Sequence, residues 1–241
     1  MTINPSGIAA DLRTLGALLY AENICSDVKP LEDAATECLR SPADDWMYTI
    51  SGLVMYVGGD GVKCNPTHLR KVECRLDVRV GGKCTPMSAT DDPLFRHSVQ
   101  IVLRAQDTSS GGKAYQQTWH FDRQPNRAPP ICAHPRYHFQ FGGHALDKLL
   151  VKSNVTQYTN LLLLDSPRMA HAPFDGILAI DFILSNLCGQ TWGKLRKHVD
   201  YVRVVGDAQR RIWRPYVEAL SGYMNQGSPT WSGPDIWPQL H

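Results

Sequence analysis

The chain has 241 residues, of which 43% are hydrophobic and 20% charged, a globular composition that excludes an intrinsically disordered chain. The formal net charge of +2 says little, but its distribution says more. Residues 1–50 hold eight acidic and three basic side chains, whereas residues 190–214 hold seven basic and two acidic ones. This asymmetry indicates either an anionic partner for the basic end or two segments that face each other.

The cysteine pattern and the first residues bear on the compartment. The seven cysteines are odd in number and form no CxxC pair, which argues against a secreted disulfide framework and a structural zinc knuckle. The N-terminus lacks the basic segment of a signal peptide, and no apolar run is long enough for a membrane span. We therefore expect a cytoplasmic protein with no membrane partner.

The first third of the chain is predicted to be helical. Apolar spacing predicts a helix over residues 8–20, and a short acidic helix follows at 29–39 with Pro30 in its first turn. The sequence Ser41-Pro42-Ala43-Asp44 is typical of a helix start. It favours a helix over the apolar residues 46–57, whose composition also suits a strand.

From Val72 the hydrophobic period changes to two. Alternating apolar and polar residues predict strands at 72–80, 99–104, 115–122 and 136–142, with Gly81-Gly82 ending the first. Their order is most simply a four-stranded antiparallel meander.

Helical patterns return after the sheet. We expect a short helix at 146–150, a helix or buried strand at 158–164, and a buried helix at 174–188 that starts at Pro173. Residues 192–223 predict one long helix or two consecutive ones, with a kink at Pro215. The predicted inner stripe of this segment is Val199, Val202, Ala208, Ile212, Tyr216 and Leu220.

This order predicts an α+β fold in which helices pack on one face of the sheet. We expect a single domain with a helical part at 1–60, the sheet at 70–144, a second helical part at 145–225 and a coil tail at 226–241.

The candidate site lies on the third and fourth predicted strands. In the stretch Ala133 to His144, three aromatics alternate with polar residues, which places Arg136, His138 and Gln140 on one strand face. If the two strands are neighbours, His120 and Asp122 project on the same side.

Two imidazoles and a guanidinium suit acid/base cleavage of a phosphodiester. We expect His138 and His120 to be the catalytic pair and Arg136 to steady the charge on phosphorus. His134, Gln140 and Asp122 support them. The residue types of His120, Asp122 and His138 also suit a divalent metal ion. A solvated sheet face is the third interpretation. We assign no metal and no cofactor.

A second candidate lies in the loop before the helix at 174–188. Arg168 and His171 stand close to a helix N-terminus, where backbone N–H groups favour anions, so we expect them to contact a phosphate or carboxylate. Alternatively, Asp175 satisfies the helix start and Arg168 pairs with Asp165. Asp181 lies within the apolar run, and a structural ion pair with Arg168 or Arg136 is the expected reason.

Basic residues gather in the predicted last helices, where they suit either nucleic-acid phosphates or a solvated helix face. They are Lys194, Arg196, Lys197, Arg203, Arg210, Arg211 and Arg214. The chain contains no GxxxxGK[ST], HExxH or GxSxG motif.

The segment from about 115 to 190 resembles a bacterial family of uncharacterised proteins. Its residues His134-Pro135-Arg136-Tyr137-His138 through Gly142, then Pro167-Arg168, Pro173 and Phe182 to Asn186, are similar to the pattern HPxxHxxxG…PR…P…FILxN. Genes of that family tend to occur beside defence or mobile-element genes. The residues Trp119 to Asp122, with His134 and His138, also resemble small bacterial toxins of the TumE type.

The order of elements resembles the ubiquitin-conjugating (E2-like) fold as well. A helix and a meander are followed by Pro129-Pro130, the dipeptide His134-Pro135 and further helices. That fold carries its catalytic cysteine after the His-Pro segment, whereas this chain has no cysteine between His134 and Cys188. The resemblance therefore implies a non-catalytic scaffold.

Two functions are expected from these patterns. The first is a bacterial intracellular protein of the defence or toxin type, whose His/Arg site binds, and in an enzyme cleaves, RNA or a nucleotide. The second is a non-catalytic E2-like adaptor that acts through a protein partner, such as one encoded nearby.

Overall fold

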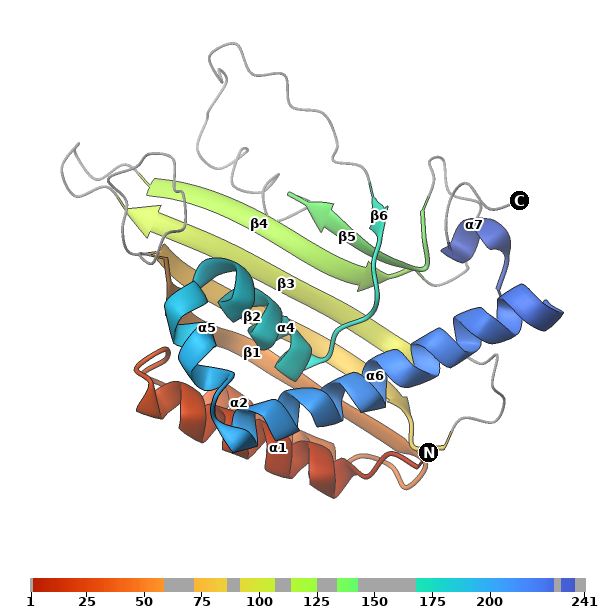
Figure 1. Ribbon diagram of the computed structural model, residues 1–241, viewed down its shortest axis with the longest axis horizontal. Coiled ribbons are helices and arrows are strands. Elements are labelled where there is room, and N and C mark those ends of the chain that lie inside the picture. Colours follow the sequence, from red (N-terminus) through yellow and green to blue (C-terminus); the bar gives the residue numbers. More distant parts are fainter. Residues whose placement is uncertain are drawn as a thin grey trace, which may run out of the picture.

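The computed structural model describes residues 2–58, 72–85, 92–106, 114–124, 134–142, 168–227 and 231–236. Within these ranges, helices near both ends of the chain enclose one side of an antiparallel sheet, which confirms the predicted α+β class (Figure 1). A hydrophobic core joins side chains of the N-terminal helices, the sheet and the C-terminal helices. The segments predicted at 146–150 and 158–164 lie outside the described residues.

Both N-terminal helices form where the apolar spacing predicts them. α1 spans Pro5–Ala21 and α2 spans Lys29–Leu39. The side chain of Asn4 accepts a hydrogen bond from the amide of Ser6 at 3.0 Å and so caps α1. Four fully buried side chains form the inner stripe of α1: Ile8, Leu12, Leu15 and Leu19.

The helix predicted for residues 46–57 is wrong, because this segment is the strand β1, Asp45–Val57. The side chains of Trp46, Tyr48 and Ile50 are buried in alternation, but the register shifts between Ile50 and Leu53. This bulge interrupts the period of two and places apolar residues three apart, which mimics helical spacing. Gly52 lies in the bulge at a φ of 66°, which favours glycine.

The predicted capping serine has another role. Ser41 Oγ accepts a hydrogen bond from the amide of Met47 at 3.0 Å, so it connects the turn to β1 rather than starting a helix. Glu37 of α2 accepts from the amide of Thr49 at 2.7 Å. Since β1 is an edge strand of the sheet, α2 thereby provides a hydrogen-bond acceptor for a backbone amide of that edge.

The sheet has six strands in the order β1-β2-β3-β4-β5-β6, and all neighbours are antiparallel. The four predicted strands correspond to four of these, and β1 and the short β6, Met169–Ala170, extend the meander on both sides. Gly81 and Gly82 lie inside β2 at a register shift instead of ending it. The bounds of the four are Val72–Lys83 for β2, Leu94–Gln106 for β3, Ala114–Arg123 for β4 and Tyr137–Phe141 for β5.

Four helices follow β6 within the described residues. They are α4, Gly176–Leu187; α5, Gly189–Leu195; α6, Val199–Gln226; and the short α7, Gly233–Ile236. Pro173 precedes α4 instead of starting it, since the cap is Asp175, which accepts from the amide of Leu178 at 2.9 Å.

The predicted inner stripe of α6 is partly wrong. Val199 and Val202 are exposed, because α5 ends at Leu195 and α6 begins at Val199 as a separate helix with a different buried stripe. The buried residues of α6 are Tyr201, Val204, Val205, Ala208, Arg211, Ile212 and Ala219.

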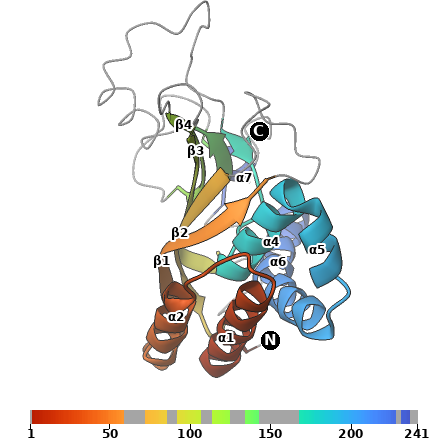
Figure 2. The same cartoon turned by 90° about the vertical axis from the view of Figure 1, so that its left-hand side faces the viewer.

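The C-terminal helices pack on one face of the sheet, which we call the inner face (Figures 1 and 2). Phe121 of β4 lies 5.3 Å from Phe182 of α4 between ring centroids, and Trp119 lies 6.1 Å from the same ring. Because side chains alternate along a strand, His120 and Asp122 project from the opposite, outer face.

A buried ion network joins the helices. Arg211 of α6 contacts Asp11 of α1 at 3.2 Å and Asp175 at the start of α4 at 3.0 Å. Arg203 contacts Asp11 from the surface side at 2.9 Å. The acidic N-terminal and basic C-terminal segments thus face each other in part, one of the two interpretations of the charge asymmetry.

Asp181 was expected to pair with Arg168 or Arg136, but its observed partners are different. Its Oδ1 accepts hydrogen bonds from Trp192 Nε1 and from the Tyr201 hydroxyl, both at 2.8 Å. Two neutral donors of α5 and α6 therefore satisfy this carboxylate, which ties these helices to α4. None of the described helices combines the length and apolar character needed to cross a membrane.

Replacing Arg211 with Met removes the buried cation and keeps much of its volume. We expect the free energy of unfolding to fall by about 3–5 kcal/mol, because the carboxylate of Asp175 then stays buried without a cation. Urea denaturation measures the change. The matched control is Arg210→Met, one residue earlier on α6, whose exposed pair with Asp207 is worth less than about 1 kcal/mol. Equal losses in both variants would contradict the role of the buried network.

Candidate functional site

Strand register brings the predicted catalytic residues together. In the β4–β5 ladder Asp122 lies opposite His138, and His120 lies opposite Gln140. All four side chains belong to the outer face, since the residues between them, Phe121 and Phe139, belong to the inner face.

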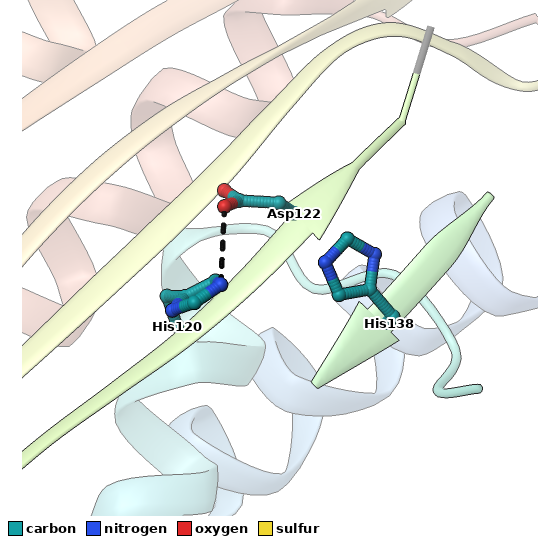
Figure 3. A group of neighbouring side chains, drawn as sticks. All are labelled: His120, Asp122 and His138. Atoms are coloured by element: carbon teal, nitrogen blue, oxygen red, sulfur yellow. Dashed lines mark ion pairs between the residues drawn. The ribbon is translucent and has the colours of Figure 1, made fainter. Parts of the chain in front are cut away.

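Three of these side chains converge (Figure 3). His120 Nε2 lies 3.6 Å from Asp122 Oδ2. The ring centroids of His120 and His138 are 6.0 Å apart. One ligand-type atom from each of His120, Asp122 and His138 lies within 4.8 Å of the other two. We call this group the outer-face triad. Asp122 is 38% exposed, so solvent reaches the group.

The protonation state of His138 follows from its contacts. Its Nδ1 lies 3.2 Å from the Pro135 carbonyl oxygen, which only accepts, so Nδ1 carries the hydrogen and Nε2 keeps its lone pair. Burial, with smaller contributions from the neighbouring His134 and His120, lowers the pKa of His138 to about 3. His138 is therefore neutral near pH 7, as a base or a ligand but not as an acid.

His134 and Arg168 lie beside the triad. The ring centroids of His134 and His138 are 4.5 Å apart. Burial, followed by the positive charge of Arg168, lowers the pKa of His134, and Arg168 also lowers that of His138. Arg168 directly precedes β6, where Ala170 lies opposite His138, so the register puts Arg168 on the outer face. Gln140 is buried on the same face.

Arg136 points to a different cluster. Its guanidinium lies 3.3 Å from Asp92 and stacks over the ring of Trp231, with its carbon 4.6 Å from the centroid. Arg123 and the Tyr137 hydroxyl contact the same carboxylate. Arg136, which we expected to contact a phosphate, thus belongs to a buried ion cluster at the start of β5.

His171 lies on the inner face, away from Arg168. Its ring packs edge-on against Phe121 and Phe174, with centroids 5.1 and 4.7 Å away, and its Nδ1–H donates to the Ala172 carbonyl at 2.7 Å. Burial lowers the pKa of His171. The expected anion site formed by Arg168 and His171 is therefore not assembled here.

The start of α4 is already satisfied. Asp175 caps it, and the amide of Gly176 donates to the Tyr48 hydroxyl at 2.8 Å. A Cβ at Gly176 would lie 2.4 Å from Ile50, so only glycine allows this close approach. Asp175 thus satisfies the helix start, as one interpretation expected. Asp165 and His144 lie outside the described residues.

Across the described ranges the cysteines are buried: Cys25, Cys38, Cys74, Cys84 and Cys188. Burial raises the pKa of Cys25, Cys38 and Cys74, which disfavours the reactive thiolate. Cys132 lies outside the described residues.

Sequence reasoning missed two features near the site. Arg79 is exposed on β2 and shares a cross-strand row with the triad, since Arg79 lies opposite Ser98 and Ser98 opposite Asp122. The alternation of the sequence shows that Arg79 points away from the apolar face of its strand. Its alignment with the triad, however, depends on the register of the β2–β3, β3–β4 and β4–β5 pairs, which the sequence does not give. His97 is buried on the inner face, where its Nε2 accepts from the amide of Phe174 at 3.1 Å.

Comparisons with protein-family models, with curated proteins and with solved structures gave no match.

His97 predicts acid sensitivity. Burial lowers its pKa to about 3, against an ordinary value of 6.5, so between these pH values the unfolded chain binds a proton that the folded chain does not. Stability is therefore lost as pH falls through this window, by up to about 1.4 kcal/mol per pH unit for one such histidine. We expect His97→Gln, which keeps a hydrogen-bond acceptor, to flatten this dependence in urea denaturation at pH 4–7. An unchanged slope would rule out this origin.

Proposed function

We propose that the outer face binds RNA or a nucleotide and cleaves its phosphodiester at the outer-face triad. The observation that supports this most is the convergence of His120, Asp122 and His138 from two paired strands within 4.8 Å. Such a group can transfer protons to and from a reacting phosphate, or hold a metal ion beside it.

Charge around the triad favours an anionic substrate. Arg168 lies close enough to lower the pKa of both His134 and His138, and its guanidinium suits phosphate oxygens. Arg168, rather than Arg136, is therefore the anion contact that we assign to the site. His134 and Gln140 line the same surface.

The row from β2 to β5 supports a substrate longer than one phosphate. Neighbouring strands are about 4.8 Å apart, so Arg79 on β2 lies roughly 10 Å from the β4 backbone, within reach of the next phosphate of a chain. Ser98 stands between them on β3. We assign Arg79 to the binding of the nucleic-acid backbone.

The biological setting rests on the resemblance of residues 115–190. Genes of the resembled family tend to occur beside defence or mobile-element genes, which favours a bacterial intracellular protein of the defence or toxin type, for which RNA is a suitable target. A cognate protein encoded nearby is the partner that such a setting implies.

A non-catalytic E2-like adaptor is the second candidate. The order of N-terminal helices, an antiparallel meander with the dipeptide His134-Pro135 before its last two strands, and further helices supports it. Cys188, the first cysteine after this dipeptide, is 6% exposed at the end of α4, which does not suit thioester chemistry. An adaptor of this kind binds a protein and leaves RNA intact.

Replacing either triad histidine tests the proposed cleavage. We expect His138→Ala and His120→Ala each to lower the cleavage rate of a fluorogenic RNA oligonucleotide by about 100-fold or more, because each removes a group at the reacting phosphate. The control is His198→Asn, which replaces an exposed histidine at the start of α6 with another capping residue. Wild-type protein that leaves RNA intact, or variants as active as wild type, would refute the proposal and favour the adaptor.

Arg79→Ala tests the binding row. We expect a several-fold rise in KM for an RNA oligonucleotide with kcat nearly unchanged, because a backbone contact remote from the reacting bond contributes to binding. The control is Arg104→Ala, an exposed arginine of β3 that donates to Gln116 at 2.9 Å. A similar KM change in both variants would indicate a general charge effect instead of the row.

A further inference from the structure

We infer that His120, Asp122 and His138 together bind one divalent transition-metal ion of the zinc type, which the sequence patterns did not assign. Its binding is independent of the proposed function, but its role in phosphodiester cleavage rests on that function. The ligand set, the spacing of the ligand atoms and the hydrogen bond behind His138 support this site.

The ligand set is the one that catalytic metal sites use. Two imidazoles and one carboxylate leave positions open for water or substrate, as in zinc hydrolases and in the facial triads of other transition metals. Magnesium and calcium prefer a set of oxygen ligands, so the two histidines favour a transition metal.

The spacing is close to that of a bound ion. Tetrahedral zinc with bonds of about 2.0–2.1 Å separates its ligand atoms by about 3.3 Å. His120 Nε2 and Asp122 Oδ2 are 3.6 Å apart, and all three residues offer atoms within 4.8 Å. Figure 3 shows His120 and Asp122 meeting over β4 with the His138 ring beside them on β5. An ion bound to all three atoms requires side-chain rotations that bring them closer together.

The hydrogen bond of His138 fixes the tautomer that a ligand requires. Metal-bound histidines almost always donate their second ring N–H to a carbonyl or carboxylate, which orients the ring and leaves the other nitrogen for the metal. His138 Nδ1 donates to the Pro135 carbonyl at 3.2 Å in this way. The His-Pro dipeptide thus presents its carbonyl behind the ligand, which gives the sequence motif a physical role.

A bound metal changes the course of the proposed cleavage. Water at the open position loses a proton to solvent and attacks phosphorus, and the bond from phosphorus to the leaving oxygen breaks. That oxygen takes a proton from solvent, so one water and one phosphodiester give a phosphomonoester and an alcohol. No 2′-hydroxyl takes part, so DNA is cleaved as well as RNA, and no 2′,3′-cyclic phosphate forms.

Metal titration tests the binding itself. The full-length protein is treated with a chelator, dialysed and titrated with ZnCl₂ by calorimetry, with CoCl₂ and visible absorption as a second probe. We expect one equivalent to bind, with at least tenfold weaker binding for Asp122→Asn and for His138→Ala and no change for His198→Asn. Asp122→Asn is nearly isosteric at a partly exposed position, so a folded variant is available. Wild-type protein that binds no metal, or Asp122→Asn that binds as tightly, overturns the inference.

Product analysis separates this inference from the proposed function. Cleavage of RNA and DNA oligonucleotides that stops with chelator and returns with zinc supports both. RNA cleavage that persists in chelator and leaves 2′,3′-cyclic ends keeps the proposed function and overturns the metal inference. Stoichiometric zinc binding without cleavage of any oligonucleotide keeps the metal site and refutes the proposed function.

Discussion

The position of Arg211 between two buried carboxylates is the constraint on which the other elements depend. Asp175 takes part twice, because one oxygen accepts from the amide of Leu178 to cap α4 while the other meets Arg211. The second carboxylate, Asp11, belongs to α1. Since a buried cation is stable only with its partners in place, this network fixes where α4 starts relative to α1 and α6.

The placement of α4 in turn determines which face of the sheet bears the site. Phe182 of α4 packs against Trp119 and Phe121, so these side chains of β4 must point inward. A slip of one residue would send His120 into the core and expose Phe121. The aromatic core and the polar triad are thus two consequences of one strand register.

Sequence predicts those parts of this fold in which one regular period holds. The four strands with clean alternation and the helices with continuous apolar stripes were found. β1 was not, because a bulge at Gly52 breaks its period. In the site, alternation correctly placed His120, Asp122 and His138 on one face. It could not show that Asp92, distant in sequence, draws Arg136 away, since ion pairing depends on tertiary contacts.

The charges that remain around the triad connect the metal inference with an anionic substrate. Among the described residues, Arg136 and Arg123 are held by Asp92, and Arg168 is a cation close to His134 and His138. Asp122 supplies a single negative charge in the triad. A divalent ion there, next to Arg168, leaves an excess of positive charge that one carboxylate does not offset. The phosphodiester of the proposed function would supply this negative charge.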